Sequence, residues 1–191
     1  MPRTLLPRRW ARTAFTLALA SGAPFGARAA TDFETGVLDE INFVRAHPLE
    51  YARWLRSAEQ PTPATLEAAD QLERTAPLGP VQFNPALGAS AAKHAGDGGA
   101  YIHTGSDGSS ASERMHREGV WASIMAEDIS FGQFTPRDVI RQLIVDENVP
   151  ARDHRADLLH PMLRMAGVGC GPHAVWGAVC VIDMSTLPPS R

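Results

Sequence analysis

Helix-type and strand-type patterns occupy different parts of this chain, and their order limits the folds it can adopt. Apolar residues recur at helical spacing in segments up to about residue 144. Strand-type patterns are confined to the last third, at 165–170 and 175–184, where apolar runs alternate with glycine. Helices followed by a hairpin predict an α+β fold with an antiparallel sheet, and they argue against the repeating units of a parallel sheet.

Capping residues mark where several predicted helices begin. Thr31 with Glu34, and Ser110 with Glu113, have the spacing of a capping box. Proline at the first turn marks other helix starts. The predicted helices cover 31–46, 48–55, 65–73, 84–97, 110–119 and 135–144, and Gly98-Gly99 is expected to stop the fourth.

The first 29 residues have the order of an export signal. Four arginines between positions 3 and 12 precede an uncharged, mostly apolar run at 13–26, and Ala27-Arg28-Ala29 is a small-x-small cleavage pattern. The run is shorter than the roughly 20 residues that span a bilayer. We therefore expect a cleaved signal peptide at 1–29, of the general secretory or twin-arginine type, and one domain at 30–191 without a membrane span.

The charge of the mature chain limits its partners. The removed segment carries five of the 18 basic residues and none of the 21 acidic ones, so the formal charge moves from −3 to −8. A chain this acidic is a poor general partner for nucleic acid, and we expect none.

The two cysteines lie on either side of the turn of the predicted hairpin. A Gly171-Pro172 turn lies between Cys170 and Cys180, with apolar, β-favouring residues on both sides. An oxidising compartment favours a disulfide here. Two buried free thiols are the alternative, and a two-cysteine metal site is less favoured because thiolate ligands usually come with further Cys or His nearby.

Two histidines and two carboxylates of the central stretch are the candidate site residues. Imidazole titrates near neutral pH and is the commonest metal ligand, and a nearby carboxylate can orient it, bind a metal beside it or take its proton. These four side chains could converge on one polar cavity: His103, Glu113, Glu127 and His154.

Each candidate also has a purely structural interpretation. Glu113 could serve as a helix cap and nothing more. His103 and His154 could simply stabilise turns. A further alternative is a serine nucleophile beside a histidine, supplied by the hydroxyl of Ser106, Ser109 or Ser110. No Gly-x-Ser-x-Gly motif supports it.

The order and spacing of several short motifs resemble the CAP superfamily, the cysteine-rich secretory, antigen-five and pathogenesis-related proteins, and in particular its exported bacterial branch. The resemblance covers most of the mature chain. It rests on Asn42-Phe-Val-Arg45, Pro77-Leu-Gly-Pro80, the segment from His103 to Ser110, Glu127-Asp-Ile129, the segment from Val145 to Arg155, and the ending from Gly167 to Asp183.

The resemblance implies a three-layer α-β-α sandwich with helices on both faces of a short antiparallel sheet. It also implies that the four candidate residues line the family's cleft, which binds divalent metal in some members and sterols, lipids or peptides in others. The chain departs from the family pattern at Asp128 and Asp153, and each change adds a carboxylate beside a cleft residue. Such a charge could favour protonated histidine or strengthen a cation site.

Two function classes follow. The favoured one is an exported, monomeric binding module whose cleft holds one divalent ion such as zinc, through His103 and His154, or a small or cell-envelope ligand, without turning it over. The alternative is a peptidase-like hydrolase of the cell envelope, in which the histidines hold zinc or act as base and a glutamate handles the proton. A structural envelope protein with a relic cavity is the third interpretation.

Overall fold

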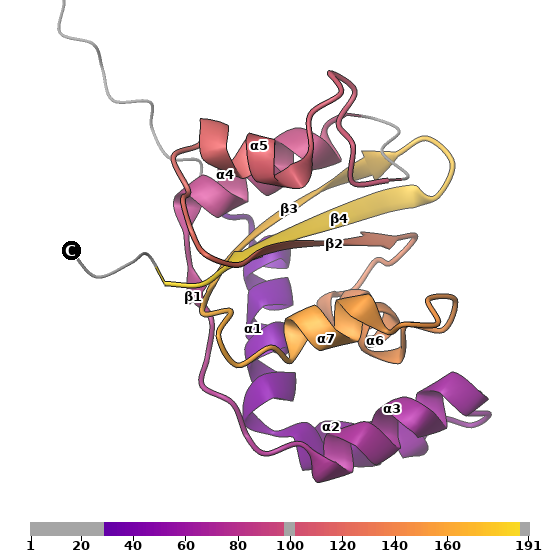
Figure 1. Cartoon of the computed structure of the whole chain (residues 1–191). Helices are drawn as coiled ribbons and strands as arrows, with labels where there is room; N and C mark the ends of the chain where they lie inside the picture. The colour runs from indigo at the N-terminus through magenta and orange to yellow at the C-terminus, as the bar shows by residue number, and fades with distance from the viewer. Residues whose placement is uncertain (1–28, 98–101, 188–191) are drawn as a thin grey trace, which may run out of the picture.

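The protein is an α-β-α sandwich built on one four-stranded sheet (Figure 1). The computed structural model describes residues 29–97 and 102–187, so the predicted signal peptide up to residue 28 and the Gly98-Gly99 stop lie outside the described residues. The strands are β1 (Gln82–Phe83), β2 (Met125–Phe131), β3 (Met165–His173) and β4 (Gly177–Ser185), in the spatial order β1-β3-β4-β2. The three long strands are antiparallel, as predicted, while the two-residue β1 pairs parallel to β3 and makes the sheet mixed.

Helices cover both faces of this sheet. Its upper face in Figure 1 carries α4 (Pro85–Ala95) and α5 (Ala111–Arg117). The lower face carries α1 (Asp32–Ala46), α6 (Pro136–Val145) and α7 (Asp153–Leu158), with α2 (Pro48–Arg56) and α3 (Pro63–Arg74) beyond them. The predicted three-layer architecture is therefore confirmed.

Two glycines of β3 let α4 lie directly on the sheet. A Cβ atom at Gly167 would come within 2.0 Å of the backbone nitrogen of Gly88, and one at Gly169 within 2.1 Å of that of Ala92. No larger residue fits at either position, because backbone rather than a movable side chain would be struck. The alternation of glycine in β3 is thus a packing requirement of the upper layer.

The helical periodicity identified the core face correctly. Val37, Ile41 and Val44 of α1 are fully buried against the lower face of the sheet. The predicted capping boxes are present, with the Thr31 side chain accepting from the Glu34 amide and the Ser110 side chain from the Glu113 amide.

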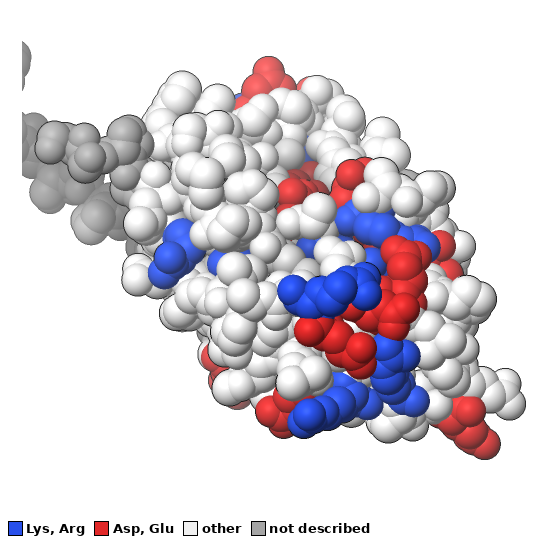
Figure 2. Space-filling view, turned by 60° about the horizontal axis from the view of Figure 1, so that its bottom comes forward, with Lys and Arg blue, Asp and Glu red and all other residues white. Residues whose placement is uncertain are grey.

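Charged side chains of both signs intermix on the face formed by α2 and α3 (Figure 2). Arg56 pairs there with Asp70 and Glu73, and Arg152 pairs with Glu67. This face therefore presents no basic patch of the kind that binds a nucleic-acid backbone.

The predicted disulfide is present. Cys170 and Cys180 lie directly opposite each other in the β3–β4 ladder, with Cα atoms 4.1 Å apart, and their sulfurs are bonded. The turn of the hairpin lies at 174–176, three residue pairs beyond the disulfide, so the predicted turn at Gly171-Pro172 is wrong and both residues belong to β3.

Removing this disulfide should lower stability. Cross-linking positions ten residues apart restricts the unfolded chain by about 2.5–3 kcal/mol on the chain-entropy model. The double variant Cys170→Ala/Cys180→Ala should lose about that much in urea unfolding at neutral pH. Adding reductant should destabilise the wild type and leave the variant unchanged; equal sensitivity of both proteins to reductant would contradict the prediction.

Candidate functional site

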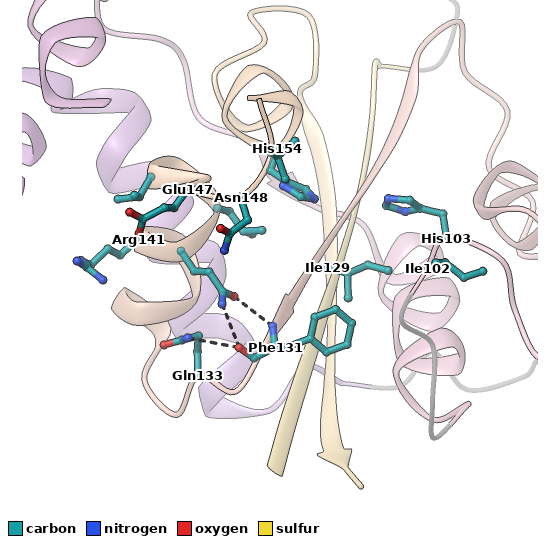
Figure 3. Close-up of a pocket in the computed structure, with 13 residues that line it drawn as sticks. Ile102, His103, Ile129, Phe131, Gln133, Arg141, Glu147, Asn148 and His154 are labelled. Carbon is teal, nitrogen blue, oxygen red and sulfur yellow. Dashed lines mark hydrogen bonds between the residues drawn. The ribbon is translucent and has the colours of Figure 1, made fainter. Parts of the chain in front are cut away.

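A cleft of about 560 Å³ lies along the outer edge of β2, which is the last strand of the sheet (Figure 3). The helical layers on either side of the sheet both contribute to it. We call it the edge cleft. The residues that define it here are Ile102 and His103 from the loop before α5, Ile129 and Phe131 from β2, Gln142 from α6 and His154 from α7.

His103 enters the edge cleft from the upper layer, and its ring lies against a buried carboxylate. Its Nδ1 lies 3.0 Å from Oε1 of Glu127, a residue of β2 that is only 7% exposed. The other oxygen of that carboxylate accepts from Arg114 of α5 at 2.6 Å. Burial alone would raise the pKa of Glu127, but the bonds from His103 and Arg114 hold that pKa below its usual value.

Arg114 also fixes the loop that carries His103. Its guanidinium donates to the main-chain oxygens of His103 at 3.1 Å and Ser109 at 2.8 Å, and it is 2% exposed. One buried side chain therefore holds both the backbone of His103 and the carboxylate partner of the imidazole.

His154 enters the edge cleft from the lower layer, and its Nδ1 also lies against a buried carboxylate. Its Nδ1 lies 2.7 Å from Oδ1 of Asp146, and its backbone amide donates to the other oxygen of the same carboxylate at 3.1 Å. Asp146 directly follows α6 as its C-cap, with a φ of 54°, and it is buried. A left-handed conformation suits aspartate better than most residues and turns its side chain back toward α7.

The two imidazoles point toward each other from opposite sides of the edge cleft (Figure 3). In both rings a carboxylate occupies Nδ1, so Nε2 is the nitrogen presented to the cleft. Within the described part of the chain, no hydrogen bond reaches either Nε2. A carboxylate on one ring nitrogen orients the other for a ligand.

Glu113, the fourth candidate, is directed to its own helix terminus. Its carboxylate accepts from the backbone and hydroxyl of Ser110, and these bonds lower its pKa. The lining of the edge cleft, as far as the structure describes it, does not include Glu113. The structure therefore places His103 and His154 in the lining of the edge cleft, with Glu127 behind His103 as its carboxylate partner, and it uses Glu113 as a cap.

The three serines considered as nucleophiles are engaged locally. The Ser106 hydroxyl donates to Asp97, that of Ser109 to Asp107, and that of Ser110 to Glu113. None of these hydroxyls bonds a histidine within the described residues.

The two departures from the family pattern have different surroundings. Asp153 is exposed at the start of α7. Asp128 is 1% exposed, and its carboxyl oxygens have no hydrogen-bond partner among the described residues. Burial raises the pKa of Asp128 well above its usual range, and nearby Asp157, Asp146, Glu127 and Asp183 add to the shift. The carboxylate that bonds His154 is Asp146, not either of these residues.

Sequence reasoning missed three residues of this site. Asp146 has a weak signal, since aspartate just after an apolar-periodic helix and before a proline often adopts the left-handed conformation. Arg114 and Gln142 have none, because each is one polar residue within an ordinary helical pattern.

Metal-ligand chemistry here depends on the two imidazoles. Across residues 29–97 and 102–187, no group of three or more His, Cys, Asp or Glu side chains is placed to hold one ion. Two neutral imidazoles with carboxylate partners are ligands that zinc accepts, and they would leave the other coordination positions to water or a bound molecule.

The fold and the site together define an α-β-α sandwich with a cleft at the edge of its sheet, flanked by two histidines. The chain matches the family model described as the cysteine-rich secretory protein family, CAP, over residues 38–184. The chain belongs to this family. No curated protein matches it.

Solved structures of similar fold come from bacteria. An outer surface protein from Borrelia burgdorferi is 14% identical with a TM-score of 0.50, and the match covers 78% of this chain and 94% of that one. An extracellular SCP-domain protein from Bacillus anthracis str. Ames is 15% identical with a TM-score of 0.48, and the match covers 78% of this chain and 43% of that one. At these identities the likeness to the Borrelia protein supports the fold alone.

Proposed function

We propose that the protein is an exported binding module whose edge cleft holds one divalent cation, such as zinc, between His103 and His154. The observation that supports this proposal is the pair of imidazoles pointing toward each other, each oriented by a carboxylate on Nδ1. Zinc bound there would polarise or coordinate a ligand in its remaining positions. Two protein ligands instead of three imply a weaker affinity than that of a structural zinc site.

Export is the second part of the proposal. Its support is the basic, apolar and small-residue order of residues 1–29, together with the similar fold of a Borrelia burgdorferi protein named as an outer surface protein. No helix within the described ranges is both long and apolar enough to cross a membrane.

Zinc titration of the mature protein tests the cation. We expect one zinc per chain, and at least a roughly 10-fold loss of affinity in His103→Ala and in His154→Ala, since each removes one of two ligands. Asp146→Asn should cost about 10–100-fold, because it keeps the ligand but loses its orienting charge. His47→Ala, an exposed histidine between α1 and α2, is the matched control and should bind like the wild type.

The same titration has a defined pH dependence. A ligating imidazole must be neutral, so zinc binding should weaken between pH 7.5 and 5.5 and release protons as it occurs. Wild-type affinity in both cleft variants, or an affinity that is equal at the two pH values, would overturn the two-histidine site.

The hydrogen bonds and the lowered pKa values of the two candidate glutamates favour binding over catalysis. Glu127 is tied to Arg114 and Glu113 to Ser110, and both have lowered pKa values, which makes them weak bases. Zinc-loaded protein should therefore leave peptide, ester and glycan substrates intact. Zinc-dependent hydrolysis that disappears in Glu127→Gln would support the hydrolase instead.

A further inference from the structure

The outer edge of β2 directs main-chain groups away from β4 at every second residue. The Gly132 amide donates to the Ala178 oxygen at 2.9 Å, and the Thr186 amide donates to the Ile124 oxygen at 3.1 Å. In the antiparallel register of β2 and β4, even-numbered residues of β2 therefore bond to β4. The N–H and C=O groups of the odd-numbered residues, including Ile129 and Phe131, point away from the sheet.

A side-chain amide already binds this edge at Phe131. The amide oxygen of Gln142 accepts from the Phe131 N–H at 3.1 Å, and its nitrogen donates to the Phe131 C=O at 3.1 Å. Figure 3 shows these bonds as dashed lines, with a further one from Gln133 to the same C=O. An amide that both donates to and accepts from one residue of an edge strand reproduces the pairing of a neighbouring strand.

The next outward-facing N–H and C=O along the strand are those of Ile129. They lie about 6.8 Å from those of Phe131, because a strand rises about 3.4 Å per residue. Ile129 lines the edge cleft between His103 and His154 (Figure 3). Within the part of the chain that the structure describes, its outward N–H and C=O have no hydrogen-bond partner. Proteins usually cover such an edge. Gln142 pairs with it at Phe131, whereas Ile129, which is 8% exposed, borders the edge cleft.

We propose that the edge cleft binds a short extended peptide, which adds to the outer edge of β2 by pairing its backbone with Ile129. This inference rests on the proposed function, since it assigns a ligand class to the same cleft. The commitment to a peptide follows from the geometry: an N–H and a C=O of one residue, side by side, match an amide backbone and not an acyl chain or a sterol.

The flanking residues define how such a peptide would lie. Side chains of a bound strand alternate between the two faces of the extended sheet, so neighbouring residues would approach the His103 side and the His154 side in turn. Gln142 occupies the pairing position at Phe131, so the paired segment ends there. Recognition would therefore combine backbone pairing with two alternating side-chain environments.

The test uses the full mature protein, kept metal-free with a chelator, and a pool of hexapeptides acetylated at the N-terminus and amidated at the C-terminus. Peptides retained by the protein are identified by mass spectrometry, and the tightest is measured by calorimetry. Methylating its backbone nitrogens one at a time should weaken binding at least 10-fold at one alternate set of positions and less than 2-fold at the other. An equal response at all positions would overturn strand addition.

Two variants at Ile129 serve as a matched pair. Ile129→Pro removes the outward N–H, a change that an edge strand tolerates, and it should abolish peptide retention. Ile129→Val keeps the N–H and should retain peptides like the wild type. In case the proline variant fails to fold, amide exchange in the wild type gives the same answer: bound peptide should slow exchange at Ile129 and leave Asp128 and Ser130, which already bond β4, unchanged. No retained peptide, or no protection at Ile129, would overturn the proposal.

Either proposal can be rejected without rejecting the other. Peptide binding is measured without metal, and zinc binding without peptide. Loss of zinc binding in the histidine variants with no retention of peptides would leave the cation site standing and reject the peptide. Peptide retention by a wild type that binds no zinc would do the reverse.

Discussion

Arg114→Met should lower the free energy of unfolding by about 3–5 kcal/mol, the usual cost of removing one partner from a buried ion pair. Arg114 and Glu127 are both almost fully buried and bond at 2.6 Å. Without the guanidinium, the Glu127 carboxylate keeps only His103 as a strong partner, and the main-chain oxygens of His103 and Ser109 lose their donor. Urea unfolding at pH 7 measures the loss.

Arg117→Met is the matched control on the same helix. Arg117 pairs with Asp107 on the surface, where both side chains are about half exposed. Such pairs contribute about 0–1 kcal/mol. Equal losses in the two variants would show that burial does not distinguish the two ion pairs.

A double variant distinguishes the cost of leaving a buried charge unpaired from the cost of losing the packing of Arg114. Adding Glu127→Gln to Arg114→Met removes the buried carboxylate and should recover a substantial part of the stability. It should not recover zinc affinity, because the backbone and the imidazole of His103 would remain unrestrained. Full recovery of both properties would mean that Arg114 only balances charge and does not position the loop.

The fold was largely predictable because most of its helices bury one apolar stripe. Val37, Ile41 and Val44 recur at helical spacing, and the capping boxes at Thr31 and Ser110 fix two helix starts. β2 and α7 were not predicted. β2 has two consecutive carboxylates, Glu127 and Asp128, which interrupt any alternation of apolar and polar residues although both are buried. α7 follows a residue with no side-chain cap hydrogen bond.

The candidate site was predictable only in part, for a different physical reason. Periodicity reports which face of an element is buried, but it does not report which polar groups meet in space. His103, Glu127 and His154 were identified with the help of the family resemblance. The partners that orient or anchor them depend on tertiary contacts: Asp146 needs a left-handed turn, and Arg114 needs a loop folded over its helix. Gln142 acts through a strand that the pattern did not predict.

Asp128→Asn should stabilise the protein at neutral pH. The side chain is fully buried beside four other carboxyl groups and has no hydrogen-bond partner among the described residues. Burial is the main reason that its pKa lies well above the usual range, and the neighbouring charges raise it further. The amide of asparagine has the same shape and never needs to bind or lose a proton.

The sign of the pH effect follows from proton linkage. Because the folded state holds the Asp128 proton more tightly than the unfolded state, the stabilising contribution is complete below an unfolded pKa of about 3.9 and is lost as pH rises. While the folded protein keeps that proton, each pH unit above the unfolded pKa lowers the free energy of unfolding by about 1.4 kcal/mol. The difference between Asp128→Asn and wild type should therefore be small at pH 4 and grow toward pH 7.

Urea unfolding of both proteins at pH 4, 5.5 and 7 measures this difference directly. Taking the difference between the free energies of unfolding of the two proteins cancels contributions that they share. One of these is that of Glu127, whose lowered pKa makes the folded state lose stability as pH falls. Asp153→Asn is the control, because Asp153 is exposed, and its effect should stay within about 0.5 kcal/mol at every pH. If Asp128→Asn destabilises the protein at pH 7, or if its effect is the same at all three pH values, then Asp128 is ionised in the folded state and a neighbouring group must balance its charge.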